Sequence, residues 1–155
     1  MVHIAIRYVL DGALRAADVS PARTLAALLG QHVGCGEGIC GSCTVVVDGV
    51  AVRSCLMLAA QADGSTIETV ASLPTIEGSA EGGLTPLQRA FTTHGAFQCG
   101  WCLAGTLVGT AAYLRDHGQA DREELKAHFA GHLCRCLGGA RLVDATLASM
   151  AETLP

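Results

Sequence analysis

The chain contains eight cysteines, and they fall into two groups of four. The first group is Cys35, Cys40, Cys43 and Cys55. The second group is Cys99, Cys102, Cys134 and Cys136. In the first group, the spacing C-x4-C-x2-C followed by a distant cysteine suits a plant-type 2Fe-2S cluster. Four thiolates in each group, with no cysteine left over, predict two independent metal sites, and such an arrangement points to the movement of single electrons.

The loop that carries the first group is rich in glycine, with Gly34, Gly36, Gly38 and Gly41 around its cysteines. Glycine adopts left-handed backbone conformations readily, so such a loop can wrap closely around a cluster. Backbone N–H groups are then free to point at the sulfurs and to help set the reduction potential. Structural zinc is the alternative, but zinc sites usually use paired C-x2-C units. The first group therefore favours an iron-sulfur cluster.

The second group is built as C-x2-C followed, after 31 residues, by C-x-C. Each pair lies just before a predicted helix, where the free N–H groups of the first turn stabilise negative charge on a thiolate. This spacing alone does not identify the metal, and iron and zinc both remain open for this group.

The first half of the chain predicts a small mixed sheet. The expected strands span residues 2–10, 13–19, 44–47, 50–54 and 66–70. Asp11-Gly12 and Asp48-Gly49 join two pairs of these strands, and Asp-Gly is a strong signal for a two-residue hairpin turn. Thr24 and Gly30 delimit a short helix. Residues 1–73 are therefore expected to form an α+β domain of the β-grasp, ferredoxin-like kind.

The second half of the chain predicts helices. Residues 74–84 are rich in Gly, Ser, Glu and Pro without a hydrophobic period, which indicates a linker. Beyond it, helices are expected over residues 86–94, 103–116, 122–130 and 141–153. Thr85-Pro86 supplies a cap and a first-turn proline, and Asp121 with Glu124 resembles a capping box. Residues 85–155 are thus expected to form a compact all-α domain of four helices.

The composition limits the classes of partner. The chain is 50% hydrophobic and 15% charged, with a net charge of -4, and has no apolar stretch long enough to span a bilayer. A lightly charged, apolar surface indicates a subunit contact. The basic residues are scattered, which argues against nucleic-acid binding. The N-terminus lacks the pattern of a secretory signal, so we expect a cytoplasmic protein whose cysteines bind metal rather than form disulfides.

Four segments carry a resemblance to a known family. They are Gly34 to Thr44 (GCGEGICGSCT), Ser54-Cys55, Gln98 to Cys102 (QCGWC) and Leu133 to Cys136 (LCRC). On these motifs the chain resembles, over essentially its whole length, the small iron-sulfur subunit of the molybdenum hydroxylases, the xanthine oxidase and aldehyde oxidoreductase family. The resemblance implies two 2Fe-2S clusters, one in a ferredoxin-like domain and one in a four-helix domain, with all eight cysteines as ligands.

The resemblance also implies a role within a complex. In such enzymes a large subunit hydroxylates a substrate carbon at a molybdenum-pterin site, using oxygen from water. Electrons then pass to the helical-domain cluster, to the ferredoxin-like cluster, and usually to FAD on a medium subunit. The match implies that Gln98 and Cys136 lie against the pterin, in a heterotrimer or a dimer of heterotrimers. It leaves open whether the substrate is an N-heteroaromatic compound, an aldehyde or carbon monoxide.

Several positions depart from the family pattern without removing a ligand. Leu103-Ala104 stands where Thr-Pro is usual, Leu137-Gly138-Gly139 where Thr-Gly-Tyr is usual, and His132 where Asn is usual. The stretch between Leu29 and Cys35 is also several residues shorter than expected. These departures bear on the fit to the large subunit and its cofactor.

Other readings of the chain stay open at this point. No Ser-His-Asp, Cys-His or paired-carboxylate arrangement suggests a catalytic site, so catalysis is expected on a partner. A free-standing two-cluster carrier is one alternative, although transient carriers usually dock through charged surfaces. A zinc-stapled interaction module is another. We expect His132 to be a loop or interface histidine rather than a ligand, and Trp101 to pack against a cluster loop or a partner.

Overall fold

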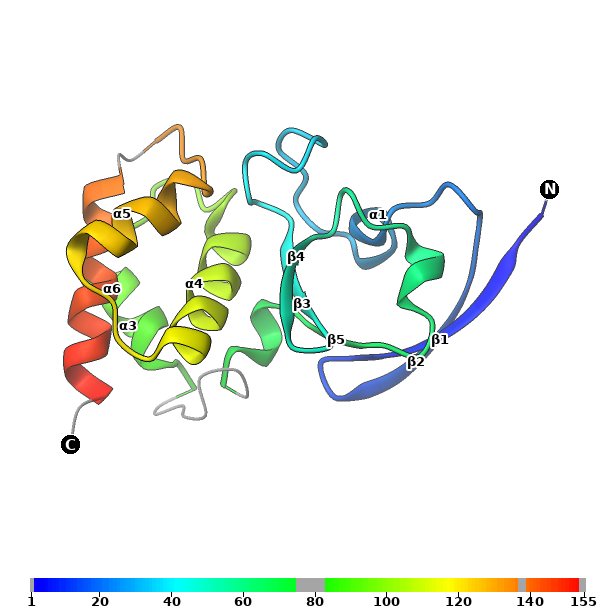
Figure 1. Cartoon of the computed structure of the whole chain (residues 1–155), viewed down its shortest axis with the longest axis horizontal. Coiled ribbons are helices and arrows are strands. Elements are labelled where there is room, and N and C mark those ends of the chain that lie inside the picture. Colours follow the sequence, from blue (N-terminus) through cyan, green and yellow to red (C-terminus); the bar gives the residue numbers. More distant parts are fainter. Residues whose placement is uncertain (1, 75–82, 137–138, 154–155) are drawn as a thin grey trace.

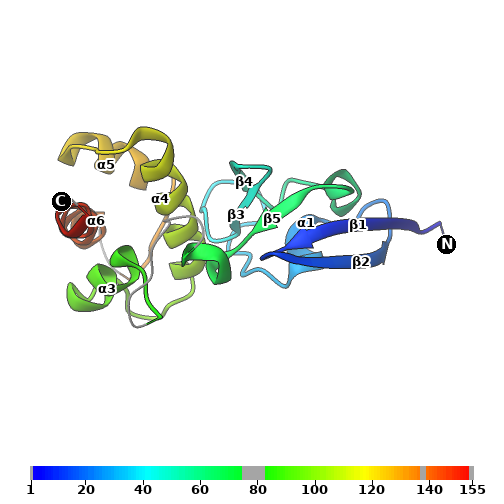
Figure 2. The same ribbon diagram turned by 90° about the horizontal axis from the view of Figure 1, so that it is seen from below.

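The computed structural model describes residues 2–74, 83–136 and 139–153. A sheet-containing part, formed by the first half of the chain, and a helical part, formed by the second half, lie side by side (Figure 1). Figure 2 shows the same separation after a quarter turn, with helix α4 facing the sheet. The predicted fold class, a ferredoxin-like α+β domain followed by a helical domain, is confirmed.

Within the described residues, one mixed sheet has the strand order β2-β1-β5-β3-β4. Its strands are β1 (Ile4–Leu10), β2 (Ala13–Val19), β3 (Thr44–Val47), β4 (Val50–Arg53) and β5 (Thr66–Glu68). Strand β5 runs parallel to β1 and antiparallel to β3. The short helix α1 (Leu25–Leu29) and the 3-10 turn η1 (Ala59–Ala62) pack together beside the sheet. Their apolar side chains enclose the N-terminal core.

Both Asp-Gly turns form as the sequence predicts. Asp11 and Asp48 each have a φ of 49°, which is the left-handed conformation that a two-residue hairpin turn requires. Their carboxylates also hold neighbouring backbone, because Asp11 accepts from Thr69 N–H at 2.7 Å and Asp48 accepts from Thr66 N–H at 2.8 Å. The bond from Thr66 lowers the pKa of Asp48. The turn at Asp48 therefore joins its hairpin to β5, and the turn at Asp11 joins its hairpin to the segment that follows β5.

Four helices make up the described part of the second half: α3 (Pro86–Thr93), α4 (Leu103–His117), α5 (Arg122–Ala130) and α6 (Gly139–Thr153). The predicted caps are present, since Thr85 Oγ1 accepts from Gln88 N–H and Asp121 Oδ1 accepts from Glu124 N–H. Helix α6 packs on α3 and α5, while α4 contacts β3 and β4 as well as α3. No helix among the described residues is long and apolar enough to cross a membrane.

Two details differ from the sequence-based expectations. Strand β5 ends at Glu68 rather than at Val70, because the Thr69 hydroxyl accepts from Ala71 N–H and starts the 3-10 turn η2 (Val70–Ser72). The expected linker lies largely outside the described residues, which exclude 75–82. The domain limits 1–73 and 85–155 therefore stay predictions.

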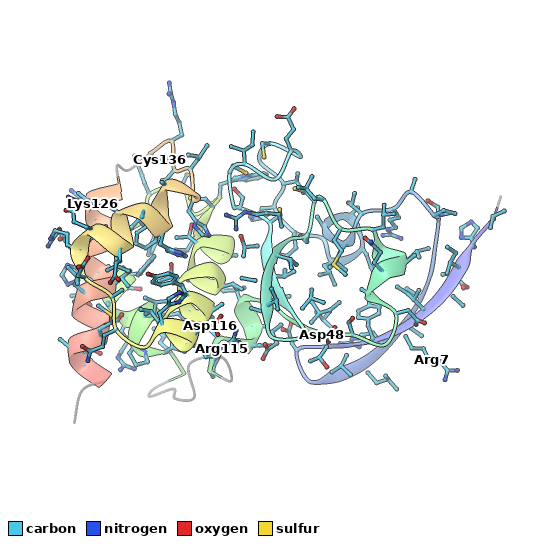
Figure 3. The ribbon with its side chains drawn as sticks, in the orientation of Figure 1. Arg7, Asp48, Arg115, Asp116, Lys126 and Cys136 are labelled. Atoms are coloured by element: carbon cyan, nitrogen blue, oxygen red, sulfur yellow. The ribbon has the colours of Figure 1, made fainter. Side chains whose placement is uncertain are left out.

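The two parts meet through a very close backbone contact. A Cβ atom placed on Gly105 of α4 would lie 2.3 Å from the carbonyl oxygens of both Gly41 and Ser42, so only glycine fits. Around this contact, Leu133 N–H donates to Cys40 O at 2.9 Å and the Arg53 guanidinium donates to Gly131 O at 2.8 Å. At the far end of α4, Arg115 donates to Gly49 O, and Figure 3 shows Arg115 at that end of the helix. These contacts hold the cysteine loop of the sheet part directly against the helical part.

We predict that Gly105→Ala lowers the free energy of unfolding by about 1–3 kcal/mol, because overpacked atoms force the backbones of the two parts apart. Alanine normally stabilises a helix relative to glycine. A lower free energy of unfolding for Gly105→Ala would therefore show that the steric clash outweighs this helix preference. Gly139→Ala, at a helical glycine whose added Cβ would meet nothing within 4 Å, is the matched control and should be neutral or stabilising. Thermal unfolding of the metal-loaded protein measures both. Equal free energies of unfolding for the Gly105→Ala and Gly139→Ala variants would contradict the prediction.

Candidate metal centres

The first group of cysteines is positioned partly by the core and partly by a loop. Cys43 and Cys55 are buried beside Ala26 of α1, and Ser54 Oγ donates to Cys43 O at 2.6 Å. Cys35 and Cys40 lie on the glycine-rich loop between α1 and β3, where Cys35 is exposed. The positive φ angles of Gly36, Gly38 and Gly41, between 74° and 77°, agree with the expected left-handed loop conformation. The core thus fixes the thiols of Cys43 and Cys55, and the loop places those of Cys35 and Cys40.

Backbone N–H groups point at the sulfur of Cys35, as the loop composition suggests. Cys40 N–H donates to it at 3.4 Å and Glu37 N–H at 3.3 Å. These two bonds lower the pKa of the Cys35 thiol to about 6, and the bond from Cys40 has the larger effect. At neutral pH the thiolate, which is the metal-binding form, therefore predominates.

The structure brings the four thiols of the first group together in two pairs. The Cys40 thiol hydrogen-bonds to Cys35 and helps to lower the Cys35 pKa. The pKa of Cys55 is raised, first by burial, next by a hydrogen bond with the Cys43 thiol, and to a smaller degree by the charges of Cys43 and Cys35. The pairs are therefore Cys35 with Cys40 and Cys43 with Cys55, and the two pairs lie close enough to interact.

The second group lines one small pocket in the helical part. All four of its cysteines contribute to the walls, and Gln98, Leu103 and Leu142 lie beside them. Cys102 is the N-cap residue of α4, and Gly100, with a φ of 78°, turns the chain between Cys99 and Cys102. Cys134 and Cys136 come from the segment between α5 and α6, where Figure 3 shows Cys136 at the edge of the helical part.

Electrostatic interactions also divide the second group into two pairs. A hydrogen bond from the Trp101 backbone N–H lowers the pKa of Cys99, and the Cys136 thiol acts in the same direction. The hydrogen bond with Cys99 is the largest cause of the raised pKa of Cys136. Burial, followed by the charge of Cys134, raises the pKa of Cys102 to about 11. Cys99 thus pairs with Cys136, and Cys102 with Cys134.

This pairing fits binuclear iron better than a single metal ion. In a 2Fe-2S cluster each of the two irons takes two protein ligands, so four cysteines are needed as two pairs. Structural zinc instead requires four ligands around one point. The paired thiols of both groups therefore suit 2Fe-2S clusters.

His132 is an interface residue, as we expected. It is 6% exposed and stacks near His128, with 4.9 Å between the ring centroids. A Cβ on Gly109 of α4 would lie 2.5 Å from His132 Nε2, so this glycine makes room for the ring. Burial, then the charges of His128 and Arg53, lower the pKa of His132 to about 4. Its Nε2 atom packs against α4 and has no hydrogen-bond partner among the residues that the structure describes.

Of the other departures from the family pattern, Leu103 lines the pocket of the second group. Leu137 lies outside the described residues. Sequence reasoning missed Arg53, which donates to Thr44 on the neighbouring strand and to Gly131 across the interface, because a single arginine at the end of a strand carries no local signal. It also missed the contact between His32 and Trp101, because these residues lie 69 positions apart in the sequence.

Two family descriptions match the chain in succession. Residues 22–78 match "2Fe-2S iron-sulfur cluster binding domain", and residues 75–147 match "2Fe-2S binding domain". The matched segments contain the first and the second group of cysteines respectively.

Three similar proteins cover most of the chain. The small subunit of nicotine 6-hydroxylase from Paenarthrobacter nicotinovorans is 46% identical over 77% of this chain and 69% of its own length. Subunit beta of the 6-hydroxypseudooxynicotine dehydrogenase complex from the same organism is 42% identical over 89% and 88%. Among solved structures, quinoline 2-oxidoreductase from Pseudomonas putida 86 matches with a TM-score of 0.86 and 38% identity, covering 97% of this chain and 94% of the matched chain.

We predict that Gly34→Ala removes the metal of the first group only. Its Cβ atom would stand 2.9 Å from Cys40 Sγ and 3.2 Å from Ser42 Oγ, so the Cys40 thiol must move away from its partners. The iron content of the purified protein should fall to about half, since one of two binuclear sites is lost. Val33→Ala, at the neighbouring exposed residue, should keep full iron. Full iron in both variants would contradict the prediction.

A second prediction concerns acid sensitivity. Burial, then the charges of Arg53 and His117, lower the pKa of His128 from 6.5 to about 4. Between these values the unfolded chain binds more protons at this residue than the folded protein, so stability is full above pH 6.5 and falls toward pH 4. His128→Gln should make urea-unfolding stability depend less on pH between 7 and 5, whereas His3→Gln, at an exposed histidine, should not. Identical pH slopes in the two variants would contradict it.

Proposed function

This chain belongs to the small iron-sulfur subunits of the molybdenum hydroxylase family, and we propose that its two groups of cysteines hold the two 2Fe-2S clusters of such a subunit. The chain is an electron-transfer subunit of an oxidoreductase complex and not the catalytic subunit. The observation that carries the proposed ligand assignment is the gathering of the thiols within each group: Cys43 and Cys55 are buried together, and all four cysteines of the second group line one pocket. When bound, each cluster accepts and releases one electron.

The proposed ligands of the first cluster are Cys35, Cys40, Cys43 and Cys55. The proposed ligands of the second cluster are Cys99, Cys102, Cys134 and Cys136. The fold supports these roles by the buried position of Cys43 and Cys55 and by the N–H donors that face Cys35 and Cys99. Burial raises the pKa of the free Cys102 thiol, so a metal that binds there displaces a proton, because the thiolate is the ligand.

We further propose that Gln98 and Cys136 contact the molybdenum-pterin cofactor held by the large subunit. Both side chains are exposed and both line the pocket of the second group, so a cofactor on a partner can reach them from solvent. The Gln98 amide has both a donor and an acceptor for the heteroatoms of a pterin ring. The sulfur of Cys136 can accept a hydrogen bond from an amino group of the ring.

The proposed partners are the large molybdenum-pterin subunit and a medium FAD subunit, in a heterotrimer or a dimer of heterotrimers. Related chains are named as a small subunit, a subunit beta and a subunit gamma, which supports a complex of several chains. Large apolar side chains are exposed beside both groups of cysteines, namely Ile39, Leu56, Trp101 and Leu133. Such side chains on a lightly charged surface are typical of a subunit contact. We also propose a cytoplasmic location.

The proposed substrate class is N-heteroaromatic compounds. Relatives of the chain are named for nicotine, caffeine and nicotinate, and the matched structure for quinoline, all of which are nitrogen heterocycles. An aldehyde is the second candidate, because a further relative is named an aldehyde oxidoreductase. The substrate pocket itself belongs to the large subunit, so the choice is tested on the complex.

The test is purification of the chain with its bound partners from the native host. About four irons per chain, a red-brown spectrum that bleaches with dithionite, and molybdenum in a co-purifying large subunit are expected. Iron without molybdenum or partners would favour a free-standing carrier instead. Zinc in a colourless protein would overturn the redox assignment.

We predict different effects for one ligand in each group. Cys43→Ser should leave the subunits associated but stop reduction of the final electron acceptor, because Cys43 lies in the sheet part and lines no wall of the second pocket. Cys102→Ser should impair both acceptor reduction and the seating of the pterin cofactor, since Cys102 lines the pocket that contains Gln98 and Cys136. Gel filtration, molybdenum content and acceptor reduction measure these effects. Equal loss of assembly in both variants would contradict separate roles.

A further inference from the structure

Arg53 joins the two parts of the protein with a single side chain. It is the last residue of strand β4, it is half-buried, and it stands opposite Thr44 in the register of β3 and β4. Its Nη1 donates to Thr44 Oγ1, and its Nη2 donates to Gly131 O at 2.8 Å. Thr44 belongs to the sheet part, whereas Gly131 caps the C-terminal end of α5 in the helical part. One planar guanidinium therefore bonds to both parts at once.

On the sheet side, the bond continues into the cysteine loop of the first group. A carbonyl oxygen only accepts, so the Thr44 hydroxyl donates its proton to Gly41 O, at 2.6 Å, and accepts from Arg53. The Thr44 N–H donates to the same carbonyl oxygen at 3.1 Å. Gly41 lies between Cys40 and Cys43 in the sequence. Arg53 therefore acts through Thr44 on the backbone that carries two of the proposed ligands.

On the helical side, the bond reaches the segment that leads to the second group. Gly131 comes shortly before Cys134 in the sequence. A Cβ atom on Gly131 would lie 3.3 Å from Arg53 Nη2, so the guanidinium lies close against this backbone. In the same segment, Leu133 N–H donates to Cys40 O at 2.9 Å. The segment before Cys134 is thus held to the first cysteine loop directly by Leu133 and also through Arg53.

The chemistry of this junction calls for arginine. The two acceptors are a hydroxyl and a carbonyl oxygen, and the described residues include no carboxylate in a salt bridge with Arg53. The guanidinium therefore serves as a donor to two acceptors and not as half of an ion pair. Its N–H groups form a rigid planar fork, whereas a lysine ammonium is a point charge on a flexible stem. Lysine at this position would keep the positive charge and lose the bridge.

We propose that Arg53 is a positioning residue for electron transfer between the two metal centres, because it ties the loop that holds Cys40 and Cys43 to the segment that holds Cys134. The inference rests on the proposed function, in which these cysteines are cluster ligands. In that transfer the second centre is oxidised and the first is reduced by one electron, with no bond made or broken. The rate of such a transfer falls steeply with the separation of the centres. Arg53 therefore keeps the transfer fast by keeping this separation fixed.

The direct test measures the magnetic interaction between the two centres. In the iron-loaded protein reduced with dithionite, each reduced centre carries unpaired spin, and the two spins split each other's electron paramagnetic resonance signals. This splitting also falls steeply with separation. Arg53→Lys should reduce the splitting while the protein keeps full iron and the signals of both centres. A splitting equal to that of the wild type would overturn the proposal. A variant that fails to bind iron would do the same, because Arg53 would then be needed for folding.

Arg115→Lys is the matched control. Arg115 also donates from a guanidinium across the two parts, to Gly49 O. It lies in the last turn of α4, at the opposite end of that helix from Cys102, and Figure 3 shows it well away from Cys136. Its bond contacts no cysteine loop, so the splitting in this variant should equal that of the wild type. Equal loss of splitting in Arg53→Lys and Arg115→Lys would overturn the proposal, because the effect would then be a general loosening of the interface.

A second variant tests the route through the loop. Thr44→Val keeps the branched shape of the side chain but removes the hydroxyl between Arg53 and Gly41 O. It should reduce the splitting in the same direction as Arg53→Lys, and the double variant should lose no more than the larger single loss. Losses that add in the double variant would show that the two residues act separately, and would overturn the proposal.

Hydrogen exchange provides a readout that does not depend on reduction. On the oxidised, iron-loaded protein, mass spectrometry should find faster exchange in Arg53→Lys for peptides that contain Thr44 and Leu133, because both N–H groups donate to the cysteine loop. Arg115→Lys should leave the exchange of these peptides unchanged. Wild-type exchange rates in Arg53→Lys would overturn the proposal.

These measurements separate the role of Arg53 from the proposed function. A wild-type protein without two reducible iron centres would contradict the proposed function itself. Two reducible centres with no magnetic interaction in the wild type, or with the same interaction in Arg53→Lys, would contradict only the role of Arg53.

Discussion

The close approach of two backbones at Gly105 is the constraint on which the arrangement of both metal centres depends. The loop between Cys40 and Cys43 lies so near helix α4 that a Cβ atom has no room between them. Because this loop carries Cys40 and Cys43 of the first group and Cys102 of the second group caps α4, the contact sets the spacing of the two groups. The bond from Leu133 to Cys40 and the Arg53 bond to Gly131 then fix the orientation of the two parts.

Each proposed metal centre combines cysteines held by the core with cysteines carried on turns. Cys43 and Cys102 are held by regular structure, at the start of β3 and of α4, whereas Cys35 and Cys99 lie exposed on turns. Backbone N–H groups face both of these exposed thiols. These donors favour the thiolate where burial does not hinder it, and ligand binding then adds folding free energy to two domains with small cores. We therefore expect metal binding and folding to be coupled in this chain.

Local signals predicted most of the secondary structure. The Asp-Gly turns and the Thr24, Thr85 and Asp121 caps each act within a few residues, and each forms as expected. The pairing of Cys99 with Cys136 could not be read from spacing, because it depends on how α4 and α5 bring distant segments together. The His32 stack and the Arg53 bond join the two parts, and neither domain's own sequence pattern contains that information. Strand β5 is shorter than expected because a side chain, that of Thr69, competes with the sheet.

The pairing of thiols has a consequence for the order in which the protein matures. All ligands of the first group lie within residues 35–55, so that centre can be completed while the rest of the chain is still being synthesised. The second centre needs Cys136 and must wait until α4 and α5 have emerged and folded back. Gly105 meets a loop whose shape is by then already set. The helical part therefore has to pack against a loop whose four cysteines were all synthesised before it.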